Sequence, residues 1–309
     1  MAFAFLFPGQ GSQSLKMMDG FADLPVVKHT FDEASDALSV DLWAMLQADS
    51  ADEINATVNT QPIMLAAGYA TYLAWQELNG RQPTLVAGHS LGEYTALVAA
   101  AALPFAEAVK LVRLRAEAMQ SAVPVGVGAM AAILNLSDED IRAACAEAAQ
   151  GEVVEAVNFN SPGQVVIAGH KGAVERAMEQ CKARGAKRAL PLPVSVPSHC
   201  ALMRPAAEQL AAALEQADIS APAIPVLHNA DVASYTEPAQ IRDALTRQLY
   251  MPVRWTETIQ KLAADGVTQM AECGPGRVLA GLAKRIDGNV KCLALTDVAA
   301  LEAARGELN

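Results

Sequence analysis

One serine in this sequence stands in a setting typical of a covalent nucleophile. Gly88-His89-Ser90-Leu91-Gly92 matches the pattern G-x-S-x-G. An apolar run before it and an alanine-rich run after it predict a strand followed by a helix. At such a junction the glycines allow a tight turn that exposes the serine Oγ, and the helix N-terminus directs its N–H groups at a reacting carbonyl. The pattern predicts acyl transfer to Ser90; a structural turn with an inert serine is the alternative.

A serine nucleophile needs a base, and five histidines are available. We favour His199, because it follows a predicted strand and opens the next helix, with Ser198 as the N-cap, at a place where a cleft is expected. His228 ends another predicted strand and is a real alternative. His89 is adjacent to the nucleophile, so its side chain should point away. No acidic residue between Ser90 and His199 has an obvious strand-end setting, so a dyad with a neutral acceptor is as plausible as a triad.

A second candidate is a charge on the apolar side of a helix. At about 100° per residue, the predicted helix Phe105–Ser121 places Arg115 beside Ala108, Val112 and Met119, away from its polar face. A lone buried charge is costly, so this guanidinium must pair with something. A structural salt bridge to Asp or Glu is one reading. The functional reading is a fork for a substrate carboxylate, which a guanidinium matches bidentately.

A third candidate is the glycine-rich segment Phe7–Gln13, FPGQGSQ, which follows the first predicted strand. It is not a nucleotide-binding loop, because no G-K-[ST] follows it. The N–H group of Gln10, between two glycines at a strand end, could stabilise an oxyanion. An ordinary glycine turn explains the pattern equally well.

The elements that must position these residues predict an α/β fold. Apolar strands that alternate with helices favour a parallel sheet covered on both faces. The predicted strands are Ala2–Phe7, Thr84–Ala87, Ile224–His228 and Thr268–Cys273, and the predicted helices are Val26–Leu38, Leu42–Leu46, Pro62–Leu78, Leu91–Ala102, Phe105–Ser121, His199–Ala217, Gln240–Gln248, Trp255–Ala264 and Val278–Arg285.

The middle of the chain, from about residue 126 to 197, has a different pattern. Its elements follow the order β-α-β-β-α-β, which is the ferredoxin-like arrangement, and predict an inserted subdomain. They are Ala129–Leu134, Asp138–Ala149, Val153–Phe159, Gln164–Ala168, Ala173–Arg184 and Ala189–Val196.

Composition excludes several classes of function. The net charge of −11 argues against a nucleic-acid partner, which requires a basic surface. The five cysteines form no C-x-x-C pair, so we expect neither a disulfide framework nor a zinc site. The N-terminus lacks the basic region of a secretory signal. A membrane span needs about 20 consecutive apolar residues, and no such run is present. We therefore expect a cytoplasmic protein without a metal.

Taken together, the motifs resemble the malonyl-CoA:acyl carrier protein transacylase family of bacterial fatty acid synthesis. The resemblance spans essentially the whole chain, and the set is far more specific than any single motif. The matching segments are FPGQGSQ (7–13), TQP (60–62), GHSLGEY (88–94), the helix of Arg115, NFNSPGQVVIAG (158–169), VPSH (196–199), RQLYMPVRW (247–255) and GPG (274–276).

The resemblance implies an α/β-hydrolase-like parallel-sheet domain made of residues 1–125 and 198–309, with a ferredoxin-like (βαββαβ) subdomain at 126–197. In such a fold Ser90 is the nucleophile and His199 the base. The N–H groups of Gln10 and Leu91 would form the oxyanion hole. A carbonyl at Gln248 would orient the histidine in place of an acid.

The resemblance also implies the substrate contacts. Arg115 would pair with the malonyl carboxylate, and Met119 would line the pocket. Gln61, Asn158 and Ser198 match positions close to the substrate, with less defined roles.

The implied reaction is a ping-pong transfer of malonyl from malonyl-CoA to the phosphopantetheine thiol of acyl carrier protein. Coenzyme A enters as part of the substrate, no bound cofactor is expected, and nothing suggests an obligate oligomer, so we expect a monomer. A hydrolase on the same serine is the main rival, and a non-catalytic carrier-protein-binding module is a second.

Carrier proteins of this pathway are acidic, and so is this chain, so a local basic patch would have to guide docking. Two compact basic pairs lie near the segments that carry the site: Lys187 with Arg188, and Lys284 with Arg285. We expect one or both to contact the carrier protein or coenzyme A, although ordinary solvated charge is the simpler explanation for any one of them.

Overall fold

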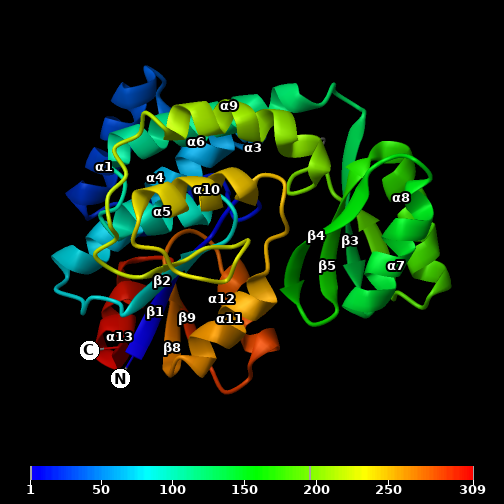
Figure 1. Cartoon of the computed structure of the whole chain (residues 1–309). Coiled ribbons are helices and arrows are strands. Elements are labelled where there is room, and N and C mark those ends of the chain that lie inside the picture. The colour runs from blue at the N-terminus through cyan, green and yellow to red at the C-terminus, as the bar shows by residue number, and fades with distance from the viewer. Residues whose placement is uncertain (1, 195, 309) are drawn as a thin grey trace.

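A computed structural model describes residues 2–194 and 196–308 and places them in two sheets with their own helices (Figure 1). The larger sheet is parallel, with the order β7-β2-β1-β8-β9. Its strands are β1 Ala2–Phe7, β2 Leu85–Gly88, β7 Val226–Leu227, β8 Val267–Glu272 and β9 Lys291–Ala294.

Strand β1 lies at the centre of this sheet and separates two layers of helices. Because side chains alternate along a strand, Phe3, Phe5 and Phe7 pack into one apolar core, and Ala4 and Leu6 into another. The first core receives residues of the helices at 25–38, 42–46, 52–55, 57–77, 92–99, 105–122, 204–214, 238–248 and 298–308, and the second receives residues of the helices at 255–264 and 278–286.

The helices follow the predicted order closely. They are α1 Pro25–Leu38, α2 Leu42–Leu46, α3 Asp52–Asn55, α4 Thr57–Glu77, α5 Gly92–Ala99, α6 Phe105–Ala122, α7 Asp138–Ala149, α8 Lys171–Ala183, α9 Arg204–Leu214, α10 Pro238–Gln248, α11 Trp255–Ala264, α12 Val278–Ile286 and α13 Val298–Leu308, with short 3₁₀ turns η1 Asp19–Phe21 and η2 Ala201–Met203.

The second sheet is antiparallel, with the order β4-β5-β3-β6. Its strands are β3 Gly128–Leu134, β4 Val154–Ser161, β5 Gln164–His170 and β6 Arg188–Pro191. Helices α7 and α8 complete a separate apolar core on this sheet, and Figure 1 shows the unit beside the larger one. The structure thus confirms the predicted fold class, a parallel-sheet α/β unit with a βαββαβ insertion.

Main-chain hydrogen bonds join the two units directly. The Val253 N–H donates to the Val157 carbonyl at 2.8 Å, and the Phe159 N–H donates to the Val253 carbonyl at 3.0 Å. A side-chain bond also joins the two units: Arg285 Nη1, on α12, donates to Gln164 Oε1, on β5, at 2.7 Å. The segment just before α11 therefore holds β4 of the smaller unit against the larger one.

The predicted start of α4 at Pro62 is wrong, because the helix begins at Thr57. A proline inside a helix leaves the carbonyl four residues earlier without its N–H donor. Here that carbonyl belongs to Val58, and Arg113 Nη1 donates to it at 3.2 Å. A contact from α6 thus satisfies the group that the proline leaves free.

The predicted helix His199–Ala217 is also wrong at its start. His199 has a φ of 65°, the chain then forms η2, and α9 begins at Arg204. Ser198 is therefore not a helix N-cap; its Oγ lies 3.5 Å from the Val196 carbonyl. Strands β6 and β7 are shorter than predicted, and α3, β9 and α13 have no predicted counterpart. Ser195, within the predicted strand Ala189–Val196, lies outside the described residues.

Candidate active site

Ser90 stands on a sharp turn between β2 and α5, with a φ of 52°. The glycines on each side make this turn possible. A Cβ on Gly88 would lie 1.9 Å from the Gly92 carbonyl carbon, and a Cβ on Gly92 would lie 2.0 Å from the Phe7 carbonyl oxygen. Only glycine allows these contacts, so the turn packs directly against the end of β1.

Ser90 and His199 come within hydrogen-bonding distance although 109 residues separate them: Ser90 Oγ lies 2.8 Å from His199 Nε2. On the other side of the ring, Nδ1 donates to the Gln248 main-chain carbonyl at 2.7 Å. That bond places the proton on Nδ1 and leaves the Nε2 lone pair facing the serine. Burial and the nearby Arg115 charge lower the pKa of His199 to about 3, so its imidazole is neutral near pH 7.

The two alternative histidines, His89 and His228, bond to residues other than Ser90. The His89 ring nitrogen Nε2 lies 2.8 Å from Asn160 Oδ1, and its ring packs on Trp255. The His228 ring nitrogen Nδ1 lies 2.7 Å from Glu93 Oε1. In the described chain, neither ring is hydrogen-bonded to Ser90 Oγ.

Arg115 lies on the apolar side of α6, as predicted, and is only 1% exposed. Its Nη1 donates to Gln61 Oε1 at 2.8 Å, and its Nη2 donates to Gln248 Oε1 at 3.0 Å and to Ser90 Oγ at 3.2 Å. Within residues 2–194 and 196–308 it forms no ion pair with a carboxylate, and its Nε has no acceptor. The structural salt bridge considered from the sequence is therefore absent from the described residues.

A cavity of about 410 Å³ opens beside these groups, between the two units of the fold. Ser90, His199 and Arg115 line it. The other predicted substrate residues line it as well: Met119, Gln61, Asn158 and Ser198. The smaller unit and the segment after it contribute apolar side chains: Met130, Val166, Leu192, Pro193, Val194 and Val196.

Gln10 and Leu91 both line this cavity, at the end of β1 and at the N-terminus of α5. The loop of Gln10 approaches the turn closely, since a Cβ on Gly9 would lie 2.4 Å from the His89 carbonyl oxygen. In the described part of the chain, neither the Gln10 nor the Leu91 main-chain N–H has a protein acceptor. Both groups are therefore available to a ligand oxygen.

The two predicted basic pairs lie outside the cavity. Lys187 and Arg188 are exposed where β6 begins, and Lys284 and Arg285 are exposed in the last turn of α12. Arg285 is engaged with Gln164 of the smaller unit. Neither pair contacts Ser90.

Three groups at the site were not predicted from the sequence. Asn229 Oδ1 accepts the Ser90 N–H at 2.7 Å, and Glu93 is fully buried behind the turn. The Gln248 side chain bonds to Arg115, in addition to the role of its carbonyl. A signal existed only for Glu93, which is a charge in an otherwise apolar helix that directly follows the serine motif.

Among the described residues, no group of three or more His, Cys, Asp or Glu side chains could hold a metal ion. No helix in that part of the chain combines the length and the apolar character that crossing a bilayer requires.

Comparisons with known proteins agree with one another. The model of the acyl transferase domain family matches residues 4–288. The malonyl CoA-acyl carrier protein transacylases of Salmonella typhimurium and Escherichia coli are each 57% identical to the chain over 98% of both sequences.

Solved structures are equally similar. An acyl carrier protein S-malonyltransferase from Vibrio cholerae is 57% identical, with a TM-score of 0.96 over 98% of this chain and 100% of that one. A malonyl-transacylase in complex with its type II PKS acyl-carrier protein is 55% identical, with a TM-score of 0.98 over 99% of this chain and 100% of that one. Identity at this level over nearly the full length means that the chain belongs to the malonyl CoA-acyl carrier protein transacylase family.

Proposed function

We propose that this protein transfers the malonyl group from malonyl-CoA to the phosphopantetheine thiol of an acyl carrier protein, through an ester on Ser90. The observation that carries the proposal is the position of the Ser90 Oγ. It lies 2.8 Å from the His199 Nε2 and 3.2 Å from the buried Arg115 Nη2. A nucleophile beside both a neutral base and a buried cation that has no carboxylate partner among the described residues suits an acyl group that bears a carboxylate.

In the first half-reaction, His199 acts as general base. Its Nε2 takes the Ser90 proton as Oγ attacks the thioester carbonyl, and the Gln248 carbonyl stabilises the imidazolium through Nδ1–H. The tetrahedral intermediate collapses when the C–S bond breaks, and His199 returns the proton to the coenzyme A thiolate. The products of this half are the malonyl ester of Ser90 and free coenzyme A.

The developing oxyanion requires N–H donors fixed before the reaction begins. The Gln10 and Leu91 main-chain N–H groups meet this requirement, because both line the cavity and neither has a protein acceptor within the described residues. A donor of this kind contributes about 3–4 kcal/mol to transition-state stabilisation.

Arg115 selects the acyl group. A malonyl carboxylate would give the buried guanidinium the anionic partner that it lacks in the described chain. An acetyl group would leave it on the neutral oxygens of Gln61 and Gln248. Met119 contacts Gln61 through sulfur at 3.7 Å and limits the space beside the fork.

In the second half-reaction, the phosphopantetheine thiol of the carrier protein enters the same cavity and the steps run in reverse. His199 takes the thiol proton, the thiolate attacks the malonyl ester, and Ser90 Oγ leaves with that proton. The apolar wall from the smaller unit, which includes Met130 and Leu192, suits an acyl-pantetheine chain. In this mechanism the protein needs no resident cofactor, and coenzyme A and phosphopantetheine enter only as carriers of the acyl group.

A hydrolase is the rival that shares this serine. An esterase for neutral acyl chains has no use for Arg115 at the nucleophile, so the geometry favours transfer of a charged acyl group. The two reactions differ in the acceptor. Release of free malonate that is faster than malonyl transfer to the carrier protein would support the hydrolase.

The deciding experiment is the intact mass of the protein after brief mixing with malonyl-CoA. We expect a malonyl-sized adduct on the wild-type protein that disappears when holo carrier protein is added. Ser90→Ala should form no adduct, and acetyl-CoA should label the wild type poorly. An adduct that persists in Ser90→Ala would show that another residue is the nucleophile.

A further inference from the structure

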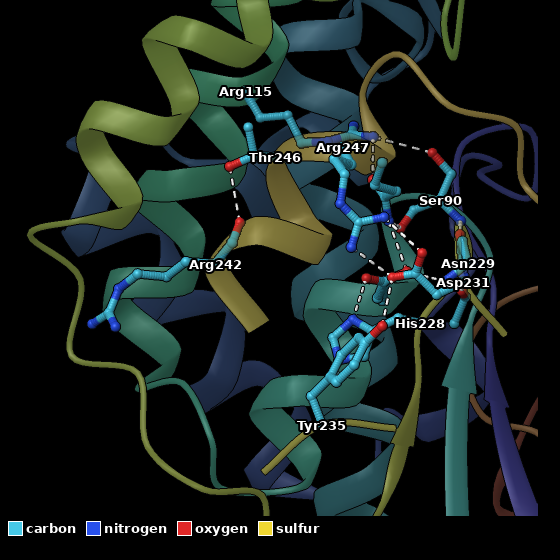
Figure 2. A network of polar contacts seen from close by, with 12 residues as sticks. Ser90, Arg115, His228, Asn229, Asp231, Tyr235, Arg242, Thr246 and Arg247 are labelled. Atoms are coloured by element: carbon cyan, nitrogen blue, oxygen red, sulfur yellow. Dashed lines mark hydrogen bonds and ion pairs between the residues drawn. The ribbon is translucent and has the colours of Figure 1, made fainter. Parts of the chain in front are cut away.

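Glu93 is a fully buried carboxylate in the first turn of α5, three residues after the nucleophile, with an exposed fraction of 0%. Three N–H donors from distant parts of the chain converge on it. Oε1 lies 2.7 Å from the His228 ring nitrogen Nδ1. Oε2 accepts from the Asn229 main-chain N–H at 2.8 Å and from Gln248 Nε2 at 3.0 Å. Figure 2 shows the network around Ser90, Arg115, His228 and Asn229.

Two of these donors also hold the nucleophile's own backbone. The Asn229 Oδ1 accepts the Ser90 N–H at 2.7 Å, and its Nδ2 donates to the Gly88 carbonyl at 2.6 Å. Gln248 Nε2 donates to the Ser90 carbonyl at 2.9 Å. Ser90 is thus held at both its N–H and its C=O by residues that are themselves bonded to Glu93.

Glu93 also determines which way the Gln248 amide faces. Both hydrogens of Nε2 have acceptors, the Glu93 carboxylate and the Ser90 carbonyl, so Oε1 must face the Arg115 guanidinium. A flipped amide would place its oxygen against the Glu93 carboxylate and its NH₂ group against the guanidinium, and both contacts are repulsive. A buried anion and a buried cation are therefore connected through one amide.

We propose that Glu93 is a positioning residue that acts through the Gln248 amide to hold Arg115, and thereby sets the preference for a carboxylate-bearing acyl group. It touches neither the substrate nor the reacting atoms. The role rests on the proposed malonyl transfer, because the selectivity of that transfer is what it would control.

Glu93→Gln tests this role with little change in volume. A glutamine offers one acceptor oxygen to three converging donors, and it removes the charge that repels a flipped Gln248 amide. We expect malonyl kcat/KM to fall about tenfold or more, as for loss of a hydrogen bond to a charged group. Acetyl kcat/KM should fall less, so the malonyl-to-acetyl ratio should drop.

Glu272→Gln is the matched control. Glu272 is also 0% exposed, but its Oε2 accepts from the Ala280 N–H at the start of α12, and among the described residues no hydrogen bond connects it to Ser90 or Gln248. This variant makes the same chemical change at equal burial. We expect it to lower the thermal midpoint without changing the malonyl-to-acetyl ratio.

A double-mutant cycle with Gln248→Met separates positioning from general stability. Methionine removes the amide and keeps the main-chain carbonyl that binds His199. If Glu93 acts through the amide, Gln248→Met lowers the ratio on its own, and adding Glu93→Gln lowers it little further. An unchanged ratio in Glu93→Gln, an equal loss for both acyl donors, or independent losses in the cycle would overturn the proposal.

If Glu93→Gln does not fold, Gln248→Met serves as the test on its own. A wild-type malonyl-to-acetyl ratio in that variant would overturn the proposed role of Glu93. Wild-type protein is assayed beside every variant. Absence of malonyl transfer by the wild type would refute the proposed function itself, whereas normal wild-type transfer with unchanged variant ratios would refute only the role of Glu93.

Discussion

Ser90 Oγ and His199 Nε2 lie 2.8 Å apart, and both residues occupy the left-handed region of backbone conformation, with φ of 52° and 65°. Residues other than glycine rarely adopt this conformation, which costs about 1–3 kcal/mol at each position. The surrounding bonds maintain it: Asn229 binds the Ser90 N–H, and the Leu249 carbonyl binds the His199 N–H at 3.0 Å. The contact between Ser90 and His199 therefore depends on strained backbone at both residues.

Relief of this strain should stabilise the fold. Glycine adopts positive φ without the steric cost that a Cβ imposes. We expect Ser90→Gly to be more stable than Ser90→Ala by about 1 kcal/mol, with both variants inactive. Chemical denaturation of the pair measures the difference. Equal stability of the two variants would show that the Ser90 backbone is not strained.

Arg115→Ala should lose malonyl preference more than acyl transfer as such. Breaking a buried, substrate-paired charge costs about 3–5 kcal/mol, so we expect the malonyl-to-acetyl ratio of kcat/KM to fall about a hundredfold or more. Arg113→Ala is the control on the same helix, because Arg113 bonds to Glu117, Asn59 and the Val58 carbonyl rather than to the site. An unchanged ratio in Arg115→Ala would refute the carboxylate fork.

The pH dependence should reveal the coupling between Arg115 and His199. The base must be neutral, so activity is lost as pH falls through the His199 pKa, which burial and the Arg115 charge lower to about 3. Removing the charge in Arg115→Gln should move the acidic limb of kcat/KM to higher pH. Acetyl-CoA is the donor to use, because it carries no carboxylate of its own. A limb at the same pH in both proteins would contradict the coupling.

Carrier-protein docking should depend on local basic residues, since the chain carries a net charge of −11. We expect Lys187→Glu with Arg188→Glu to raise the carrier-protein KM several-fold, with little effect on the KM for malonyl-CoA, and the difference should shrink at high salt. Lys28→Glu, on α1 and paired with Asp32, is the surface control. An unchanged carrier-protein KM would assign Lys187 and Arg188 to ordinary solvated surface.

For Lys284 and Arg285, changing both residues would also break a contact between the two units, because Arg285 bonds to Gln164 of the smaller unit. Lys284→Glu alone is therefore the informative variant. We expect it to raise the carrier-protein KM without lowering the thermal midpoint. A lower midpoint with an unchanged KM would assign this end of α12 to the joint between the two units.

The sequence by itself determined the elements that local chemistry controls. The G-x-S-x-G turn needs glycines at both ends because backbone lies within 2.0 Å of where their Cβ atoms would be, and that requirement is visible as a motif. The helical period of residues 105–121 predicted that Arg115 lies on the apolar side of its helix, and Arg115 is buried. The β-α-β-β-α-β order of its elements along the chain predicted the second sheet.

Only the tertiary structure decided which distant groups meet. Neutral amides rather than a carboxylate hold Arg115, and Glu93 is buried beneath the turn. No helix starts at His199 as expected. The residue has a positive φ, and its N–H donates to the Leu249 carbonyl. Such contacts join residues fifty or more positions apart, or depend on strained backbone that the surrounding fold maintains, and local sequence preference carries no information about either.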